Sequence, residues 1–112
     1  MINTFKYALR GIAKAFATQR NMRIHGVVLA LVVIAGIYFR LSNLEWIAII
    51  LCSGIVLATE IVNTAIEEIV NFISPEKNEK AGLIKDLSAG AVLVAALTAV
   101  IVGLIIFLPR IL

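Results

Sequence analysis

Charged residues are scarce in this 112-residue sequence: they make up 15% of it, against roughly 25% in ordinary soluble domains. Hydrophobic residues make up 62% instead. A water-soluble fold of this length buries only about two thirds of the surface that its unfolded chain exposes, so it could not hide this much apolar surface. The composition therefore argues against a soluble domain and favours a protein that lies in a lipid bilayer.

Cysteine and histidine occur only once each, as Cys52 and His25. A lone cysteine excludes an intramolecular disulfide, and no pair of these residue types stands at metal-ligand spacing, so redox chemistry and structural zinc are not expected. We interpret Cys52 as a small apolar residue and His25 as a hydrogen-bonding residue at the membrane interface.

Acidic residues are absent before Glu45, whereas five basic residues precede the first long apolar run: Lys6, Arg10, Lys14, Arg20 and Arg23. A basic arm can bind nucleic acid, but this one leads directly into apolar sequence. Anionic lipid headgroups suit it better, so we expect a lipid bilayer and no nucleic acid as partner. Within the arm, apolar residues recur every three or four positions over residues 2–18, which predicts an amphipathic surface helix.

Three apolar stretches follow that reach, with their flanks, the roughly 20 residues needed to cross hydrocarbon. A tight turn joins the first two, with Trp46 behind it as an interfacial anchor. A polar loop over residues 74–86, with Gly82 as a turn former, joins the last two, and Pro109 ends the third. The predicted fold is an all-α membrane protein, one domain over residues 1–112, with a surface helix and spans at residues 24–40, 46–73 and 86–108.

Basic residues also predict the orientation of the chain. Five Lys or Arg side chains precede the first span and three lie in the second loop, whereas the first loop and the tail have one each. The positive-inside rule places the amino terminus and the second loop in the cytoplasm.

One polar stripe interrupts the second span. On a helix, separations of three, four and seven residues place these side chains on one face: Glu60, Asn63, Thr64, Glu67 and Asn71. A carboxylate in hydrocarbon costs at least ~2.5 kcal/mol, so intramembrane acids indicate a functional site. A hydrogen-bonded seam between helices is the structural alternative.

The two stripe acids are expected at different depths. At ~1.5 Å rise per residue, Glu67 reaches the cytoplasmic interface and Glu60 lies ~10 Å deeper. Glu67 can meet a cation-bound ligand from water, whereas desolvation suits Glu60 to the role of a general base. Lys85 and Asp86 open the third span at the level of Glu67, where the lysine can pair with phosphate oxygens or merely anchor the helix.

Small residues form a ridge along the third span that allows close helix contact: Ser88, Ala91, Ala95, Ala99 and Gly103.

The motif Glu60-Ile-Val-Asn63-Thr-Ala-Ile-Glu67, followed by Lys85-Asp86 and this small-residue span, closely resembles the signature of the prokaryotic diacylglycerol kinase family. The resemblance extends over almost the whole chain. That family includes diacylglycerol kinases and undecaprenol kinases, and the segment around His25 together with the Phe-Leu-Pro-Arg tail is more similar to the undecaprenol kinases.

The resemblance implies a domain-swapped homotrimer in the bacterial cell membrane that uses MgATP from the cytoplasm and a lipid alcohol from the bilayer. Carried over by position, Glu60 is the base, Glu67 a metal ligand, Asn63 a positioning amide and Lys85 a phosphate contact that Asp86 supports. Six residues match positions that the family uses near the nucleotide: Tyr7, Arg10, Gly11, Glu67, Glu76 and Asn78.

Two positions depart from the family pattern. The family often has an acid where this chain has Gln19 and an aspartate where it has Asn71. The first departure affects the expected metal site, because a missing carboxylate weakens the coordination of a hard cation.

These features together predict an enzyme that transfers the γ-phosphoryl group of ATP to the hydroxyl of diacylglycerol or undecaprenol, giving phosphatidate or undecaprenyl phosphate. Magnesium and Lys85 would neutralise the transferring group. A small proton-coupled exporter that titrates at Glu60 and a non-catalytic membrane scaffold are the alternatives.

Overall fold

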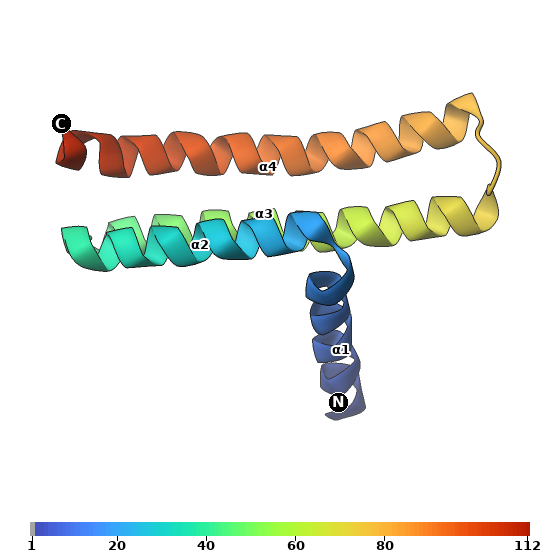
Figure 1. Cartoon of the computed structure of the whole chain (residues 1–112), viewed down its shortest axis with the longest axis horizontal. Helices are drawn as coiled ribbons and strands as arrows, with labels where there is room; N and C mark the ends of the chain where they lie inside the picture. Colours follow the sequence, from blue (N-terminus) through green and yellow to red (C-terminus); the bar gives the residue numbers. More distant parts are fainter. Residues whose placement is uncertain (1) are drawn as a thin grey trace.

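The computed structural model describes residues 2–112, and these residues form four helices. Helices α2, α3 and α4 run side by side, while α1 leaves them at a steep angle (Figure 1). Each of α2, α3 and α4 is long and apolar enough to cross a membrane. The predicted all-α class, with an amino-terminal helix before three spans, is confirmed. The helices are α1 (Ile2–Thr18), α2 (Arg20–Phe39), α3 (Asn43–Ile73) and α4 (Glu79–Ile111).

The joint between α1 and α2 is fixed by backbone and side-chain hydrogen bonds. Gln19 stands between the two helices in an extended conformation, and its N–H donates to the Ala15 carbonyl at 2.9 Å. The Arg23 guanidinium donates to the last free carbonyls of α1, Phe16 at 3.2 Å and Ala17 at 3.0 Å. A cation at the carboxyl end of a helix is favourable, and these two bonds tie the first turn of α2 to the end of α1.

The turn between α2 and α3 is shorter than expected. Arg40 adopts a left-handed conformation with φ 55°, and the Leu41 N–H reaches back to the Gly36 carbonyl, as in a Schellman cap. Ser42 then caps α3, because its side chain accepts from the Glu45 N–H while the Glu45 carboxylate accepts from the Ser42 N–H. Glu45 therefore belongs to the first turn of α3.

The predicted loop over residues 74–86 is wrong in length. Helix α3 ends at Ile73 and α4 begins at Glu79, so only residues 74–78 connect them. Asn78 starts α4 early, because its side-chain oxygen accepts the Ala81 N–H at 2.8 Å and so caps the helix. Gly82 consequently lies inside a helix and makes no turn.

Lys85 and Asp86 lie within the second turn of α4 and do not open it. Pro109 also fails to end the helix, which continues to Ile111. A proline this close to a helix end removes one N–H while the surrounding backbone stays helical. The Leu112 N–H and the Arg110 guanidinium supply donors to the carbonyls of Leu108 and Ile106.

An ion pair and a buried apolar cluster stabilise the end of the bundle near the α2–α3 turn. Arg110 donates through its two terminal guanidinium nitrogens to the two carboxylate oxygens of Glu45, at 2.5 and 2.7 Å. Leu41, Ile49 and Ile106 form a buried cluster beneath this pair. Two-point contact fixes the guanidinium plane, so the ends of α3 and α4 are held in register.

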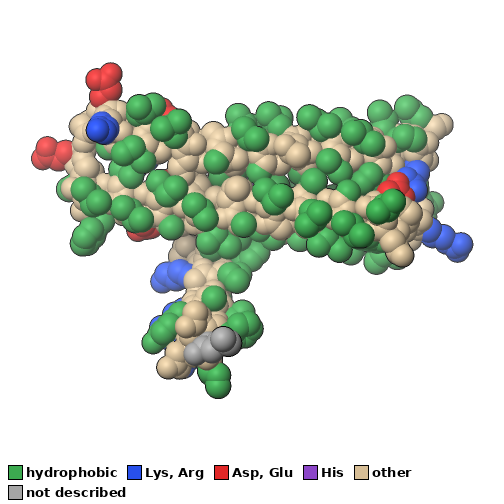
Figure 2. All heavy atoms as spheres, turned by 180° about the vertical axis from the view of Figure 1, so that it is seen from behind, with side chains coloured by type: hydrophobic (Ala, Val, Ile, Leu, Met, Phe, Trp, Pro, Cys, Tyr) green, Lys and Arg blue, Asp and Glu red, His purple; other side chains and the backbone are tan. Residues whose placement is uncertain are grey.

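The helices differ in length in a way that determines where polar residues emerge. At about 1.5 Å per residue, the 20 residues of α2 span ~30 Å, whereas the 31 residues of α3 span ~46 Å. Figure 1 shows α3 and α4 continuing past the level at which α1 departs. Charged side chains gather at the two ends of the bundle and along α1, and green hydrophobic side chains cover its middle (Figure 2). The overhang of α3 and α4 therefore reaches beyond a slab of hydrocarbon that α2 just crosses.

Gly36 packs directly under the Trp46 ring, and we expect Gly36→Ala to destabilise the protein. A Cβ there would lie 2.5 Å from the indole and 3.0 Å from Leu41 Cδ1. Overpacking of this kind costs about 1–3 kcal/mol. The matched control is Gly54→Ala, since a Cβ at Gly54 meets nothing within 4 Å. Thermal unfolding in detergent should show a lower Tm for the first variant alone, and an unchanged Tm for Gly36→Ala would contradict this packing.

Candidate active site

The polar stripe of α3 faces the other helices. Glu60 and Asn63 are only 2% and 8% exposed, although most side chains of this single chain are open to their surroundings. Thr64 and Glu67 are half-buried and Asn71 is exposed, so burial decreases along the stripe toward the loop. The stripe thus runs from a buried acid to a polar helix end.

Asn63 connects α3 to α4. Ser88 donates its hydroxyl to Asn63 Oδ1 at 2.7 Å, and Asn63 Nδ2 donates to Glu67 Oε1 at 3.3 Å. The amide is held on both sides, and it orients one oxygen of the Glu67 carboxylate. The sequence identifies Ser88 only as part of a small-residue ridge, because spacing shows which residues share a face and not which side chain they meet.

Glu60 meets a residue of α2. Its Oε2 lies 3.6 Å from His25 Nε2, and the two side chains are 3% and 23% exposed. The Thr64 hydroxyl donates to the Glu60 carbonyl at 3.0 Å, which ties the backbone of this turn to the stripe. His25, predicted to form hydrogen bonds at the membrane interface, thus lies beside the candidate base.

Lys85 points from α4 to the end of the stripe. Its ammonium donates to Asn71 Oδ1 at 2.6 Å. A cavity of about 280 Å³ adjoins it, between the end of α3, the connecting loop and the start of α4. Glu76 and Asn78, two of the predicted nucleotide residues, line this cavity together with Lys85. Asp86 is exposed, and its support of Lys85 stays a prediction.

The predicted nucleotide residues of α1 lie elsewhere. Tyr7 and Arg10 are exposed, with the Arg10 guanidinium 5.4 Å from the centre of the Tyr7 ring. A Cβ at Gly11 would meet nothing within 4 Å. None of these three residues lines the cavity beside Lys85. A single chain therefore brings together the α3, α4 and loop residues and leaves those of α1 apart.

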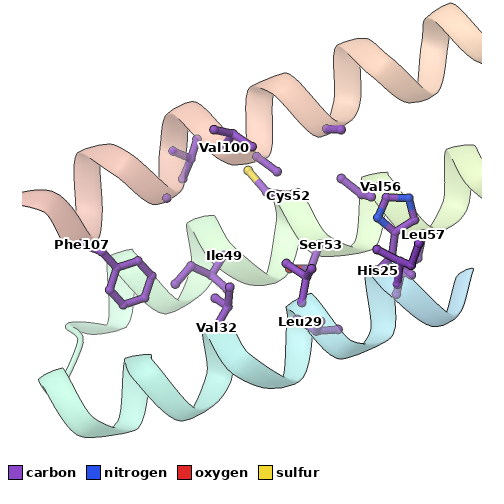
Figure 3. Close-up of a pocket in the computed structure, with 16 residues that line it drawn as sticks. His25, Leu29, Val32, Ile49, Cys52, Ser53, Val56, Leu57, Val100 and Phe107 are labelled. Carbon is purple, nitrogen blue, oxygen red and sulfur yellow. The ribbon is translucent and has the colours of Figure 1, made fainter. Parts of the chain in front are cut away.

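An apolar groove of about 410 Å³ runs between α2, α3 and α4 (Figure 3). His25 lies at one end of it and Phe107 at the other. Val56 and Leu57 line the groove beside His25, and they precede Glu60 by one helical turn. Glu60 therefore lies where the apolar groove meets the polar stripe.

The small residues of α4 have two different surroundings. Ser88 and Ala95 are buried, whereas Ala99 and Gly103 help to line the groove.

Comparison with known proteins gives the family. The family model described as prokaryotic diacylglycerol kinase matches residues 6–107. The chain belongs to the prokaryotic diacylglycerol kinase family. It is accordingly a lipid kinase with membrane-spanning helices, and neither the exporter nor the scaffold alternative is favoured.

Curated members of the family align over most of this kinase. The undecaprenol kinase of Bacillus subtilis is 40% identical over 107 residues, covering 96% of this chain and 87% of its own length. A diacylglycerol kinase of Synechocystis is 40% identical over 113 residues, and the alignment covers 100% of this chain but 65% of that protein. The diacylglycerol kinase of Escherichia coli strain K12 is 31% identical, with 90% and 83% covered. Relatives of both named activities are thus similar to this member of the family.

The Mg²⁺ that the family resemblance implies would have few protein ligands in one chain of this kinase. Residues 2–112 contain no group of three or more His, Cys, Asp or Glu side chains that could hold a metal. Mg²⁺ is commonly bound by one or two carboxylates plus substrate phosphates, and Glu67 supplies one half-buried, oriented carboxylate. The donor set therefore fits a cation that arrives with a nucleotide. Gln19 makes no side-chain hydrogen bond to the end of α2, so its amide is not used as a helix cap.

Proposed function

We propose that this chain transfers the γ-phosphoryl group of ATP to the primary hydroxyl of undecaprenol, giving undecaprenyl phosphate for cell-envelope lipid metabolism. Diacylglycerol, which would give phosphatidate, is the second candidate substrate. The observation that carries the proposal is the position of Glu60, which lies beside His25 and one helical turn beyond Val56 and Leu57, three residues that line the apolar groove, at the start of the polar stripe. A lipid alcohol needs both surroundings at its hydroxyl, and a soluble substrate does not.

Each polar group has a role that its surroundings support. Glu60 accepts the proton of the lipid hydroxyl, since it is a buried carboxylate beside the groove. Lys85 contacts the phosphate chain in the cavity next to Asn71, with Glu76 and Asn78 on the wall of the same cavity. Magnesium, bound with the nucleotide, would neutralise charge on the transferring group. Asn63 holds Glu67 toward that cation, and Asp86 supports Lys85.

The residues of α1 enter this scheme through a second copy of the chain. Tyr7, Arg10 and Gly11 are exposed and do not line the cavity beside Lys85 within one chain. A domain-swapped homotrimer would let α1 of one protomer cover the cavity of another. This assembly is part of the proposal, and it is supported by the exposure of Tyr7 and Arg10 in the single chain.

The active site is proposed to face the cytoplasm of a bacterial cell. Basic residues gather in α1 and around the connection between α3 and α4, as the positive-inside rule requires of the cytoplasmic side. The connection between α3 and α4, residues 74–78, lies beyond the level at which α1 departs (Figure 1). ATP would therefore reach the cavity from water while the lipid stays in the bilayer.

The decisive experiment measures lipid-dependent ATP consumption by the purified protein in nanodiscs. The proposed kinase consumes ATP only when a lipid alcohol is present, and the phosphorylated lipid appears in equal amount. A proton-coupled exporter or a scaffold would consume none. Parallel assays with undecaprenol and diacylglycerol at equal mole fraction test the substrate, and faster turnover of diacylglycerol would reverse the assignment.

Gln19 gives a prediction about the metal. A neutral amide oxygen binds a hard divalent cation less well than a carboxylate, so Gln19→Glu should lower the magnesium concentration needed for half-maximal activity. The parent should be active with a high magnesium requirement. The measurement is lipid phosphorylation against magnesium at fixed ATP, with Gln19→Asn as a neutral control. An unchanged magnesium dependence in Gln19→Glu would show that Gln19 lies outside the metal shell.

A further inference from the structure

His25 is the side chain from another helix that meets the candidate base. Two ion-pair contacts occur among the described residues. One joins Arg110 to Glu45 near the α2–α3 turn, and the other joins His25 to Glu60 at 3.6 Å. The side-chain hydrogen bond that reaches Glu60 within residues 2–112, from Thr64, ends on its backbone carbonyl and not on its carboxylate. His25 is therefore the group that can determine where this carboxylate points.

The contact is longer than a hydrogen bond, which needs about 3 Å. Catalytic hydrogen bonds are often long in a protein without substrate and shorten when substrate binds. A movement of a few tenths of an ångström would bring Nε2–H into hydrogen-bonding range of Oε2. The half-buried position of His25 leaves room for this movement, while Glu60 is enclosed.

Burial makes the orientation of Glu60 important. A glutamate side chain has three rotatable bonds, and a base works only when its oxygen is within reach of the proton that it accepts. His25 lines the apolar groove together with Val56 and Leu57, so it stands at the end of the groove where the lipid hydroxyl would arrive. Figure 3 shows its ring beside these two residues, at the opposite end from Phe107.

We propose that His25 is a positioning residue for Glu60. Its Nε2–H holds Oε2 in the rotamer that faces the lipid hydroxyl, and it acts only through that carboxylate. In the transfer step the hydroxyl proton passes to Glu60 as the new O–P bond forms and the bond to ADP breaks, and His25 keeps its own proton. The inference rests on the proposed function and adds a residue of α2 to it.

Three substitutions test the contact. His25→Gln places an amide N–H close to the position of Nε2, whereas His25→Asn places it near Nδ1, and His25→Leu removes the donor. We expect His25→Leu and His25→Asn to lower kcat for lipid phosphorylation by about 10-fold to 100-fold, as loss of an orienting partner does elsewhere. His25→Gln should restore kcat to within about fivefold of the parent, and KM for MgATP should stay within twofold in all three.

A double-mutant cycle with Glu60→Asp separates positioning from helix packing. Aspartate is one methylene shorter, which takes its carboxylate out of reach of His25, so His25→Leu should cost less than about threefold in that background. If the kcat losses of His25→Leu and Glu60→Asp multiply in the double variant, His25 merely packs α2 against α3. Equal kcat values for His25→Gln and His25→Asn would lead to the same conclusion. If His25→Leu fails to fold, the comparison of the two amides still decides.

The outcome for His25 is distinguishable from failure of the proposed function. Full activity of His25→Leu together with loss of activity in Glu60→Gln would overturn the positioning role and leave the base in place. Full activity in Glu60→Gln would remove the base itself, and the proposal for His25 with it.

Discussion

Replacing Glu60 by glutamine is expected to lower lipid-dependent turnover by about 10²-fold to 10⁴-fold, the usual loss when a general base is removed. The amide has the shape of the carboxylate but cannot accept the hydroxyl proton. MgATP affinity should stay within a few-fold of the parent, because the phosphate-binding candidates lie around Lys85, at the end of the stripe. Turnover in nanodiscs and equilibrium nucleotide binding measure the two quantities separately.

Glu60→Asp is the matched variant, because it keeps a carboxylate in a displaced position. It should retain more activity than Glu60→Gln, and the difference reports proton acceptance in particular. The structural alternative is a hydrogen-bonded seam, in which the amide serves as well as the acid. Turnover of Glu60→Gln within threefold of the parent would favour that seam and remove Glu60 from the role of base.

The sequence predicts the large features of this fold because they depend on local pattern. Apolar residues at three- and four-residue spacing predict α1, and long uncharged runs predict the three spans. The polar stripe was also evident, since residues seven apart on a helix share a face, and its inward orientation followed from the cost of exposing acids to hydrocarbon. The burial of Glu60 and Asn63 agrees with that expectation.

The errors lie where two local signals compete. Polar residues after Ser74 predicted a long loop, but the cap that Asn78 provides starts α4 at Glu79. Pro109 predicted a helix end, yet a proline in the last turn forfeits little hydrogen bonding. Composition shows that a segment is polar, and the position of the cap then decides whether it is coil or helix.

The partners within the site required the structure. The Asn63–Ser88 hydrogen bond and the contact between Glu60 and His25 each join different helices. Their existence depends on the rotation and axial offset of one helix against another, which small side chains such as Ser88 permit but do not specify. Lys85 similarly meets Asn71 at the helix ends. The acids of the site and the amide of Asn63 were thus predictable from the sequence, whereas the contacts of Ser88 and His25 with them were not.

Replacing Glu67 by glutamine is expected to weaken MgATP binding by about 10-fold to 100-fold, since loss of one charged contact costs roughly 1.5–3 kcal/mol. Glu67 is half-buried near the polar end of the stripe, and Asn63 Nδ2 holds one of its oxygens. The other oxygen remains available to a cation that arrives with the nucleotide phosphates. An amide there offers one neutral oxygen, so high magnesium should restore part of the lost affinity, and kcat at saturation should recover with it.

Glu68→Gln is the matched control for this variant. Glu68 is the next residue along α3, but its side chain is exposed whereas that of Glu67 is half-buried. It should leave MgATP affinity within twofold of the parent, so that a general loss of negative charge is separated from loss of a ligand. Titrations of nucleotide at several magnesium concentrations give both affinities. If Glu67→Gln binds magnesium and nucleotide as the parent does, then Glu67 does not ligate the metal, and the hydrogen bond from Asn63 serves only to join α3 to α4 through Ser88.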